Sequence, residues 1–179
     1  MQQMFQATSD IIDCKMRSVW SRATEVAAVC GVLAKAYTRL RPDQATLAGL
    51  THMIGVLPIL AWAEEHPQLL QDSLTLDRVI DSIHGSLGTM ILQRWDFPDE
   101  IALVPAHYTD FERRNEKIDY TDIVMVASLQ LLSGTDHPHA KIDWSGIQAF
   151  ANIGLYTDVE TGQLNELAEE IDLAKSFIA

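Results

Sequence analysis

Apolar side chains recur every three or four positions through almost the whole chain, and this spacing is typical of amphipathic helices. The longest such stretch, at about 17–40, is apolar over more than half of its circumference, which predicts a central, buried helix. The stretch IVMVASLQLL, at about 119–132, predicts another helix that is buried on most sides. Strictly alternating patterns, which indicate strands, are essentially absent. Further helices are expected at about 1–13, 43–65, 76–95, 98–108, 144–153 and 159–177. The pattern therefore predicts an all-α fold.

Prolines, glycines and capping residues separate the predicted helices. Pro42 is expected to close the long helix and to occupy the first turn of the next one. Gly55 and Pro58 are expected to break or bend the helix that follows. Thr75 is a candidate N-cap. Polar surface loops are expected at 109–117 and 133–142.

The charge of the chain narrows the classes of partner. Thirteen lysines and arginines against 25 aspartates and glutamates leave a net charge of −12. Proteins that bind nucleic acids or anionic membranes rely on basic clusters, and Arg113-Arg114 is the longest one here. We therefore expect no nucleic acid and no membrane partner. No uninterrupted apolar run reaches about 18 residues and the N-terminus does not resemble a secretory signal, so we expect a cytoplasmic protein. Cys14 and Cys30 lack metal-type spacing and are expected to be buried free thiols.

The histidines are the candidate chemistry of this chain. Three of them lie in turns beside prolines, where a surface role is expected: His66, His137 and His139. His52, His84 and His107 lie on predicted helices. Singly, each is typical of a hydrogen-bonded core histidine. Together, if three helices brought them side by side, they would suggest a hydrolytic metal site.

Several stretches carry a family resemblance. They are VWSRATEVAAVCGVLAKAY, ATLAGLTHMIGVLPIL, IHGSLGTMILQRWDFPDEIALVPAHY and IVMVASLQLL. In order and spacing they resemble the HDOD family, a branch of the HD-domain superfamily of helical metal-dependent phosphohydrolases. The resemblance implies an HD-domain-like helical bundle at 1–135, with 136–179 as a C-terminal helical extension packed on the same domain. HDOD proteins usually carry further helices ahead of this segment, so we expect apolar faces that lack their usual cover and a chain that self-associates or binds a partner.

The resemblance also identifies where the metal ligands of active HD phosphohydrolases would lie. Here Arg22 replaces the first histidine, the His-Asp pair reads His52-Met53, and His84 is kept. A later His-His pair reads His107-Tyr108, and Ser128 stands where a final aspartate is expected. A methionine thioether suits neither Mg²⁺ nor Mn²⁺, and arginine adds a fixed positive charge. We therefore expect a remnant pocket with no metal, no other cofactor and no catalytic residue.

Three hypotheses follow. The first is a non-catalytic HDOD domain that binds protein partners in bacterial signal transduction. The second is a metal-dependent phosphohydrolase with residual metal binding, either through His52, His84 and His107 without carboxylates or with the help of an acid such as Asp81. The third is a small-ligand sensor in which Arg22 receives an anion. Metal content of the purified protein would separate the second hypothesis from the others.

Overall fold

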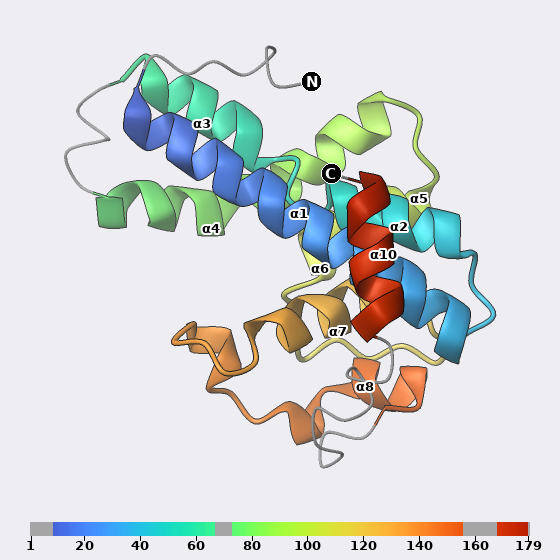
Figure 1. Ribbon diagram of the computed structural model, residues 1–179. Coiled ribbons are helices and arrows are strands. Elements are labelled where there is room, and N and C mark those ends of the chain that lie inside the picture. Colours follow the sequence, from blue (N-terminus) through green and yellow to red (C-terminus); the bar gives the residue numbers. More distant parts are fainter. Residues whose placement is uncertain (1–8, 67–72, 156–167, 179) are drawn as a thin grey trace.

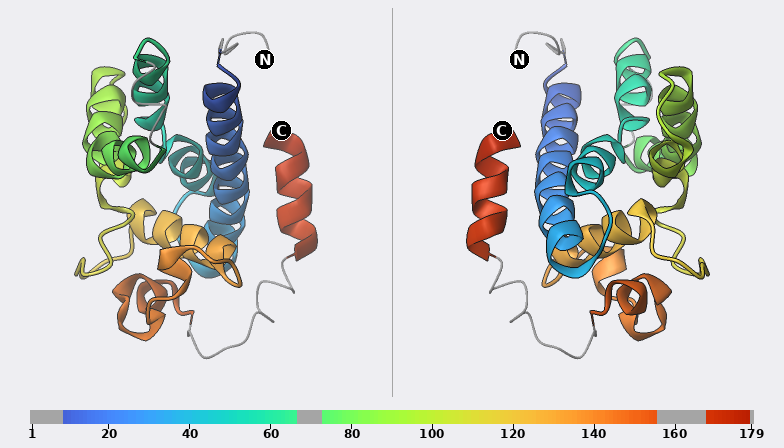
Figure 2. Two further views of the ribbon diagram at one scale, coloured as in Figure 1. Left: turned by 90° about the vertical axis from the view of Figure 1, so that its left-hand side faces the viewer. Right: turned by 90° about the vertical axis from the view of Figure 1, so that its right-hand side faces the viewer.

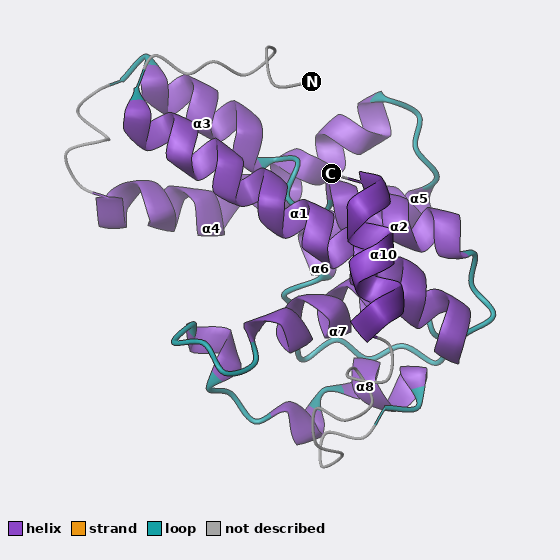
Figure 3. Cartoon of the chain, in the orientation of Figure 1, coloured by secondary structure: helices purple, strands orange, loops and turns teal. Residues whose placement is uncertain are grey.

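The computed structural model describes residues 9–66, 73–155 and 168–178 (Figure 1). Its helices, in chain order, are α1 (Asp10–Tyr37), α2 (Pro42–Thr51), α3 (Val56–Glu64), α4 (Ser73–Arg94), α5 (Asp99–Ala102), α6 (Val104–His107), α7 (Tyr120–Leu132), the 3₁₀ helices η2 (Pro138–Ala140) and η3 (Trp144–Gly146), α8 (Gln148–Ile153) and α10 (Ala168–Ile178). Across these described ranges there is no strand, and Figure 3 shows helices joined by loops. The all-α prediction is confirmed.

Helix α1 is the centre of the fold, since α2, α3, α7 and α10 all pack against it. Figure 2 shows α10 on one side of α1 and both α3 and α4 on the other. The segment 23–34 is buried at every position except Glu25 and Gly31, as the apolar pattern predicted. The expected break between a helix at 1–13 and one at 17–40 is wrong, because α1 runs unbroken from Asp10. No proline or glycine interrupts 10–30, and acidic Asp13 in the first turn favours a helix N-terminus.

Two groups of buried apolar side chains hold the helices together. The larger joins the second half of α1 to α2, α7 and α8, with Leu33, Val124 and Phe150 among its members. The smaller joins the start of α1 to α3 and α4, with Ile12 and Leu60 among its members. The two ends of α1 thus serve two cores, and several helices pack around α1, which explains why so much of its circumference is apolar.

Two glycines, Gly55 and Gly85, let the main chain of the α2–α3 turn and of α6 approach α4 closely. A methyl group added at Gly55 would overlap the carbonyl oxygen of His84 and lie 2.6 Å from the amide nitrogen of Gly88. One at Gly85 would lie 2.7 Å from the carbonyl oxygen of Pro105. Only a residue without a Cβ fits at such separations. The position of His84 on α4 is therefore fixed by main-chain contacts.

Helix boundaries differ from expectation where caps and turns decide them. Pro42 is the first residue of α2, and the chain turns between α2 and α3 at Gly55, both as expected. Thr75 is not an N-cap, because α4 already begins at Ser73.

The remaining expected helices are shorter than the pattern suggested. The predicted helix at 98–108 is two short helices, and the one at 144–153 is divided into η3 and α8 because Ile147 is extended. The last helix, expected at 159–177, is described only as α10, and 159–167 and 1–8 lie outside the described residues.

The stretch Pro42–Glu64 is, by length and hydropathy, the single candidate for a membrane-spanning helix in the described part of the chain. Half of its most apolar window is buried inside the fold, and a turn divides it into α2 and α3. Core helices of globular bundles pass the same composition test.

A buried carboxylate organises the start of α7. The Asp122 side chain is 2% exposed and accepts hydrogen bonds from Arg113 Nη1 at 3.0 Å and from the Nδ2 atoms of Asn115 and Asn152 at 2.9 Å each. Asp122 and the N-cap Asp119 also form a reciprocal capping box, and Arg113 pairs with Asp119 as well. This network attaches the segment 110–118 and helix α8 to α7.

Candidate functional site

His52 lies at the C-terminal end of α2 and is 1% exposed. Its Nδ1 lies 2.5 Å from the carbonyl oxygen of Gly49, so Nδ1 donates the proton and Nε2 keeps its lone pair. Burial lowers the pKa of His52 to about 4, and the positive charge of Arg22 acts in the same direction. His52 is therefore neutral near pH 7.

His84 and Tyr108 meet His52 at the same place. His84 Nδ1 lies 2.8 Å from the carbonyl oxygen of Ile80, and its Nε2 lies 3.1 Å from the hydroxyl of Tyr108. With Nδ1 donating, Nε2 of the neutral ring accepts and the Tyr108 hydroxyl donates. The rings of His52 and Tyr108 are in edge contact, with centroids 4.8 Å apart. Burial raises the pKa of Tyr108 to about 12. We refer to His52, His84 and Tyr108 as the histidine cluster.

The other residues of the expected remnant pocket are placed differently. Met53 is half-buried and packs against the smaller apolar core. Ser128 is buried on α7, and its hydroxyl has no hydrogen-bond partner. His107, expected to join His52 and His84, is exposed at the end of α6 instead. It is the next residue, Tyr108, that turns inward, since a one-residue step on a helix rotates the side chain by about 100°.

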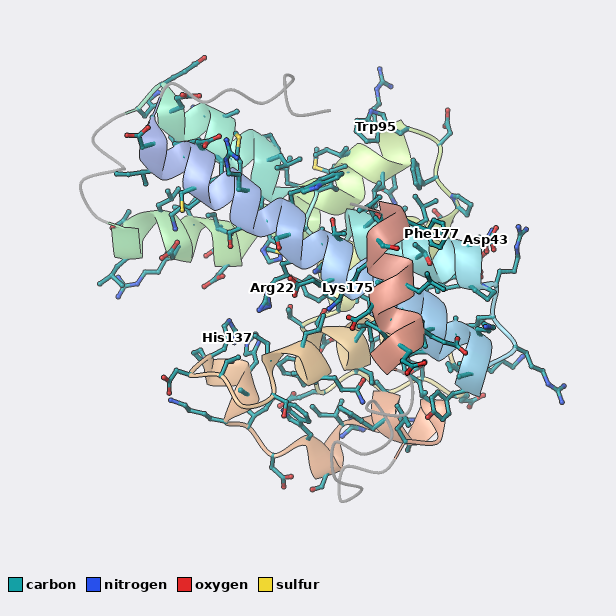
Figure 4. The ribbon with its side chains drawn as sticks, viewed as in Figure 1. Arg22, Asp43, Trp95, His137, Lys175 and Phe177 are labelled. Carbon is teal, nitrogen blue, oxygen red and sulfur yellow. The ribbon has the colours of Figure 1, made fainter. Side chains whose placement is uncertain are left out.

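Two histidines that were expected to be surface residues interact electrostatically with Arg22: His137, which is exposed, and His139, which is half-buried. Burial lowers the pKa of both His137 and His139, and Arg22 acts on both in the same direction, while Asp81 of α4 opposes it. Figure 4 shows Arg22 extending from α1 toward the segment that carries His137. The sequence pattern could not reveal this, because the two histidines come more than 100 positions after Arg22 and only the folded chain brings them together.

The cysteine prediction is half right. Both thiols are free, and Cys30 is buried, but Cys14 is exposed. Cys14 falls on the polar side of the first turns of α1, where the helix has little cover.

The donor set does not suit the divalent metal that HD phosphohydrolases use. Both nitrogens of His84 are engaged in hydrogen bonds, and the neighbouring side chains are Tyr108, Met53 and the cation Arg22. Among the described residues no group of three or more histidines, cysteines or acids is arranged to hold a metal ion. Hard divalent cations require oxygen ligands, and anionic ones above all.

Comparisons with known proteins agree with this fold. The family model for the HDOD domain matches residues 1–111. A crystal structure of a protein from Shewanella amazonensis SB2B, named as a metal-dependent phosphohydrolase, is 25% identical, with a TM-score of 0.82 over 99% of this chain and 65% of that one. A signal transduction protein from Marinobacter aquaeolei VT8 is 19% identical, with a TM-score of 0.63 over 89% of this chain and 38% of that one, and supports the fold alone. The chain thus spans less than two thirds of the length of each. The comparison with curated proteins gave no match.

Proposed function

Because the chain belongs to the HDOD domain family, we propose that it is a non-catalytic signal-transduction or protein-interaction domain. In this proposal it keeps the helical frame of HD phosphohydrolases without their metal chemistry. The name of the Marinobacter protein, which shares the fold, is consistent with a signalling role.

The observation that carries the proposal is the chemistry of the histidine cluster. His52 is held neutral by burial, and both nitrogens of His84 are occupied. Met53, which by the family resemblance stands where a metal-binding aspartate is expected, packs against apolar side chains. A dication placed there would meet the positive charge of Arg22 with no buried carboxylate to offset it.

The surface supports a protein partner rather than a nucleic acid. Trp20, Trp62 and Trp95 are 47%, 51% and 59% exposed, and large aromatic side chains are enriched where proteins bind one another. The net charge of −12 would repel a phosphate backbone. Another copy of the chain is one such partner.

The second candidate is a phosphohydrolase with residual metal binding through histidines. The Shewanella protein's name favours it, since that chain is similar over almost the whole of this one. The two candidates differ over what a carboxylate at position 53 would do.

The substitution Met53→Asp tests the proposal. In a non-catalytic domain it places a carboxylate in a half-buried apolar contact, and we expect a loss of about 2–3 kcal/mol in the free energy of unfolding. Added Mn²⁺ should not recover this loss. In a residual metal site the same carboxylate restores a ligand, so Mn²⁺ should stabilise the variant above the wild type. Urea unfolding with and without Mn²⁺ measures the difference.

Met53→Leu is the matched control, because it keeps the volume and should cost less than about 1.5 kcal/mol. Metal analysis of the wild-type protein, purified without chelator, provides a second measurement. About one metal ion per chain, lost when His52 and His84 are both replaced by glutamine, would refute the non-catalytic proposal.

A further inference from the structure

The family resemblance places Arg22 in the remnant pocket, but it does not explain the pair His137 and His139, toward whose segment Arg22 extends (Figure 4). The two histidines lie beyond the 1–111 match to the HDOD family model. They do not belong to the histidine cluster, and the proposed signalling function makes no use of them.

The two imidazoles are held in defined orientations. His137 is the N-cap of η2, and its Nδ1 accepts a hydrogen bond from the amide of His139 at 3.2 Å. In the neutral ring the proton is then on Nε2, which is left as a donor. The His139 ring contacts Phe111 and His137 edge-on, with centroid separations of 5.0 and 4.9 Å. Trp144 Nε1 donates to the His139 carbonyl oxygen at 3.0 Å and fixes the main chain there.

Arg22 supplies a permanent charge that no carboxylate of the described residues pairs with. It is half-buried, and within the described residues its guanidinium makes no ion pair and no hydrogen bond. A guanidinium is always protonated and presents a planar set of donors that matches two oxygens of a phosphate or carboxylate. Arg113, by comparison, is fully committed to Asp119 and Asp122.

We propose that Arg22, His137 and His139 bind a small phosphate-type oxyanion, either inorganic phosphate or a phosphate monoester. The guanidinium would contribute charge-assisted hydrogen bonds, and the imidazole N–H groups would donate to the remaining oxygens. Each imidazole gains a further positive charge if it takes up a proton, which a dianion favours. The net charge of −12 disfavours anion binding over the rest of the protein, so binding is expected to be confined to this group of residues.

One neighbouring carboxylate should weaken binding of the proposed ligand, so two substitutions are expected to change the phosphate affinity in opposite directions. Asp81 is exposed on α4 and acts electrostatically on the same two imidazoles as Arg22 does. A carboxylate near a bound phosphate repels it. Asp81→Asn should therefore strengthen phosphate binding, whereas Arg22→Gln should weaken it.

The experiment titrates the intact protein with inorganic phosphate and, in a second arm, with glycerol 3-phosphate, using chloride to hold the ionic strength constant. Calorimetry gives the affinity, and imidazole NMR signals report the place of binding. We expect saturable binding with an affinity that falls about tenfold or more in Arg22→Gln, as loss of a charge-assisted hydrogen bond implies. The signals of His137 and His139 should shift, while that of His66, which stacks on Trp62, should not. Tighter binding in the second arm would identify a monoester, and tighter binding in the first arm would identify free phosphate.

Arg78→Gln, on the exposed face of α4, is the matched control and should leave the affinity unchanged. The proposal is overturned by absence of saturable binding up to about 10 mM phosphate, or by an Arg22→Gln affinity within about twofold of wild type. Shifts that include His66 as strongly as His137 would also overturn it, because they would show a non-specific effect of the anion. None of these outcomes depends on whether the domain is catalytic.

Discussion

Removal of the Asp122 carboxylate should damage the fold more than removal of any exposed acid. Asp122→Ala deletes an acceptor that serves Arg113, Asn115, Asn152 and the amide of Asp119. Arg113 keeps its pair with Asp119, but the two asparagine amides lose a hydrogen-bond acceptor in a partly buried site. The segment 110–118 and helix α8 would then lose their common attachment to α7.

The magnitude follows from burial. The Asp122 side chain is 2% exposed, and Arg113 is 21% exposed, so solvent screens their interaction only weakly. Breaking a buried charged pair by removing one partner costs about 3–5 kcal/mol. For a domain of this size that corresponds to a fall in melting temperature of about 6–20 °C.

Two further variants isolate the cause. Asp43→Ala removes an acid whose pair with Arg41 is exposed and screened by solvent, and it should leave the melting temperature nearly unchanged. Asp122→Asn keeps the shape but turns an NH₂ group toward a donor whichever way the amide is oriented, since both oxygens of Asp122 accept. It should be nearly as destabilising as alanine. Thermal and urea unfolding measure the stability of Asp122→Ala, Asp122→Asn and Asp43→Ala. A loss below about 1 kcal/mol in Asp122→Asn would refute the argument, because the network would then depend on shape and not on acceptors.

Two other predictions concern titrating groups. The folded-state pKa of His52 is about 4, below the ordinary value of about 6.5, so the unfolded chain binds its proton more readily. Above about pH 6.5 the wild type should therefore exceed His52→Gln in free energy of unfolding by a constant amount. As the pH falls to about 4, the wild type should lose about 3 kcal/mol of this difference, as measured by urea unfolding. A difference that does not change with pH would contradict the burial of a neutral ring. A thiol reagent should label exposed Cys14 in the native protein and Cys30 only after denaturation, since burial raises the pKa of the Cys30 thiol and excludes the reagent. Fast labelling of both thiols in the native protein would contradict the burial of Cys30.

The sequence predicts the helices well because their signal is local. Apolar spacing alone locates α1, α2, α4 and α7, although it places a break near the start of α1 that the structure lacks and misses boundaries that hydropathy does not encode. Ile147 lies at such a boundary, because its extended conformation separates η3 from α8.

The candidate site could be predicted only in part, because it depends on contacts between distant segments. His52 and His84 were found from their helical setting and from the family resemblance. His137 and His139 were missed, since the tertiary fold alone brings them near Arg22. The Asp122 network did have a local signal. Asp119 and Asp122 are spaced as a capping box, and that spacing indicates an ordered helix start.

The close contacts at Gly55 and Gly85 make the backbone position near His84 independent of the side chains around the histidine cluster. At these two positions main-chain atoms limit how closely α4 and its neighbours approach. Substitutions at Arg22, Met53 or Ser128 can therefore accumulate over generations without moving the backbone that carries His84. A scaffold built in this way offers a protein engineer fixed positions at which a new set of ligands could be installed.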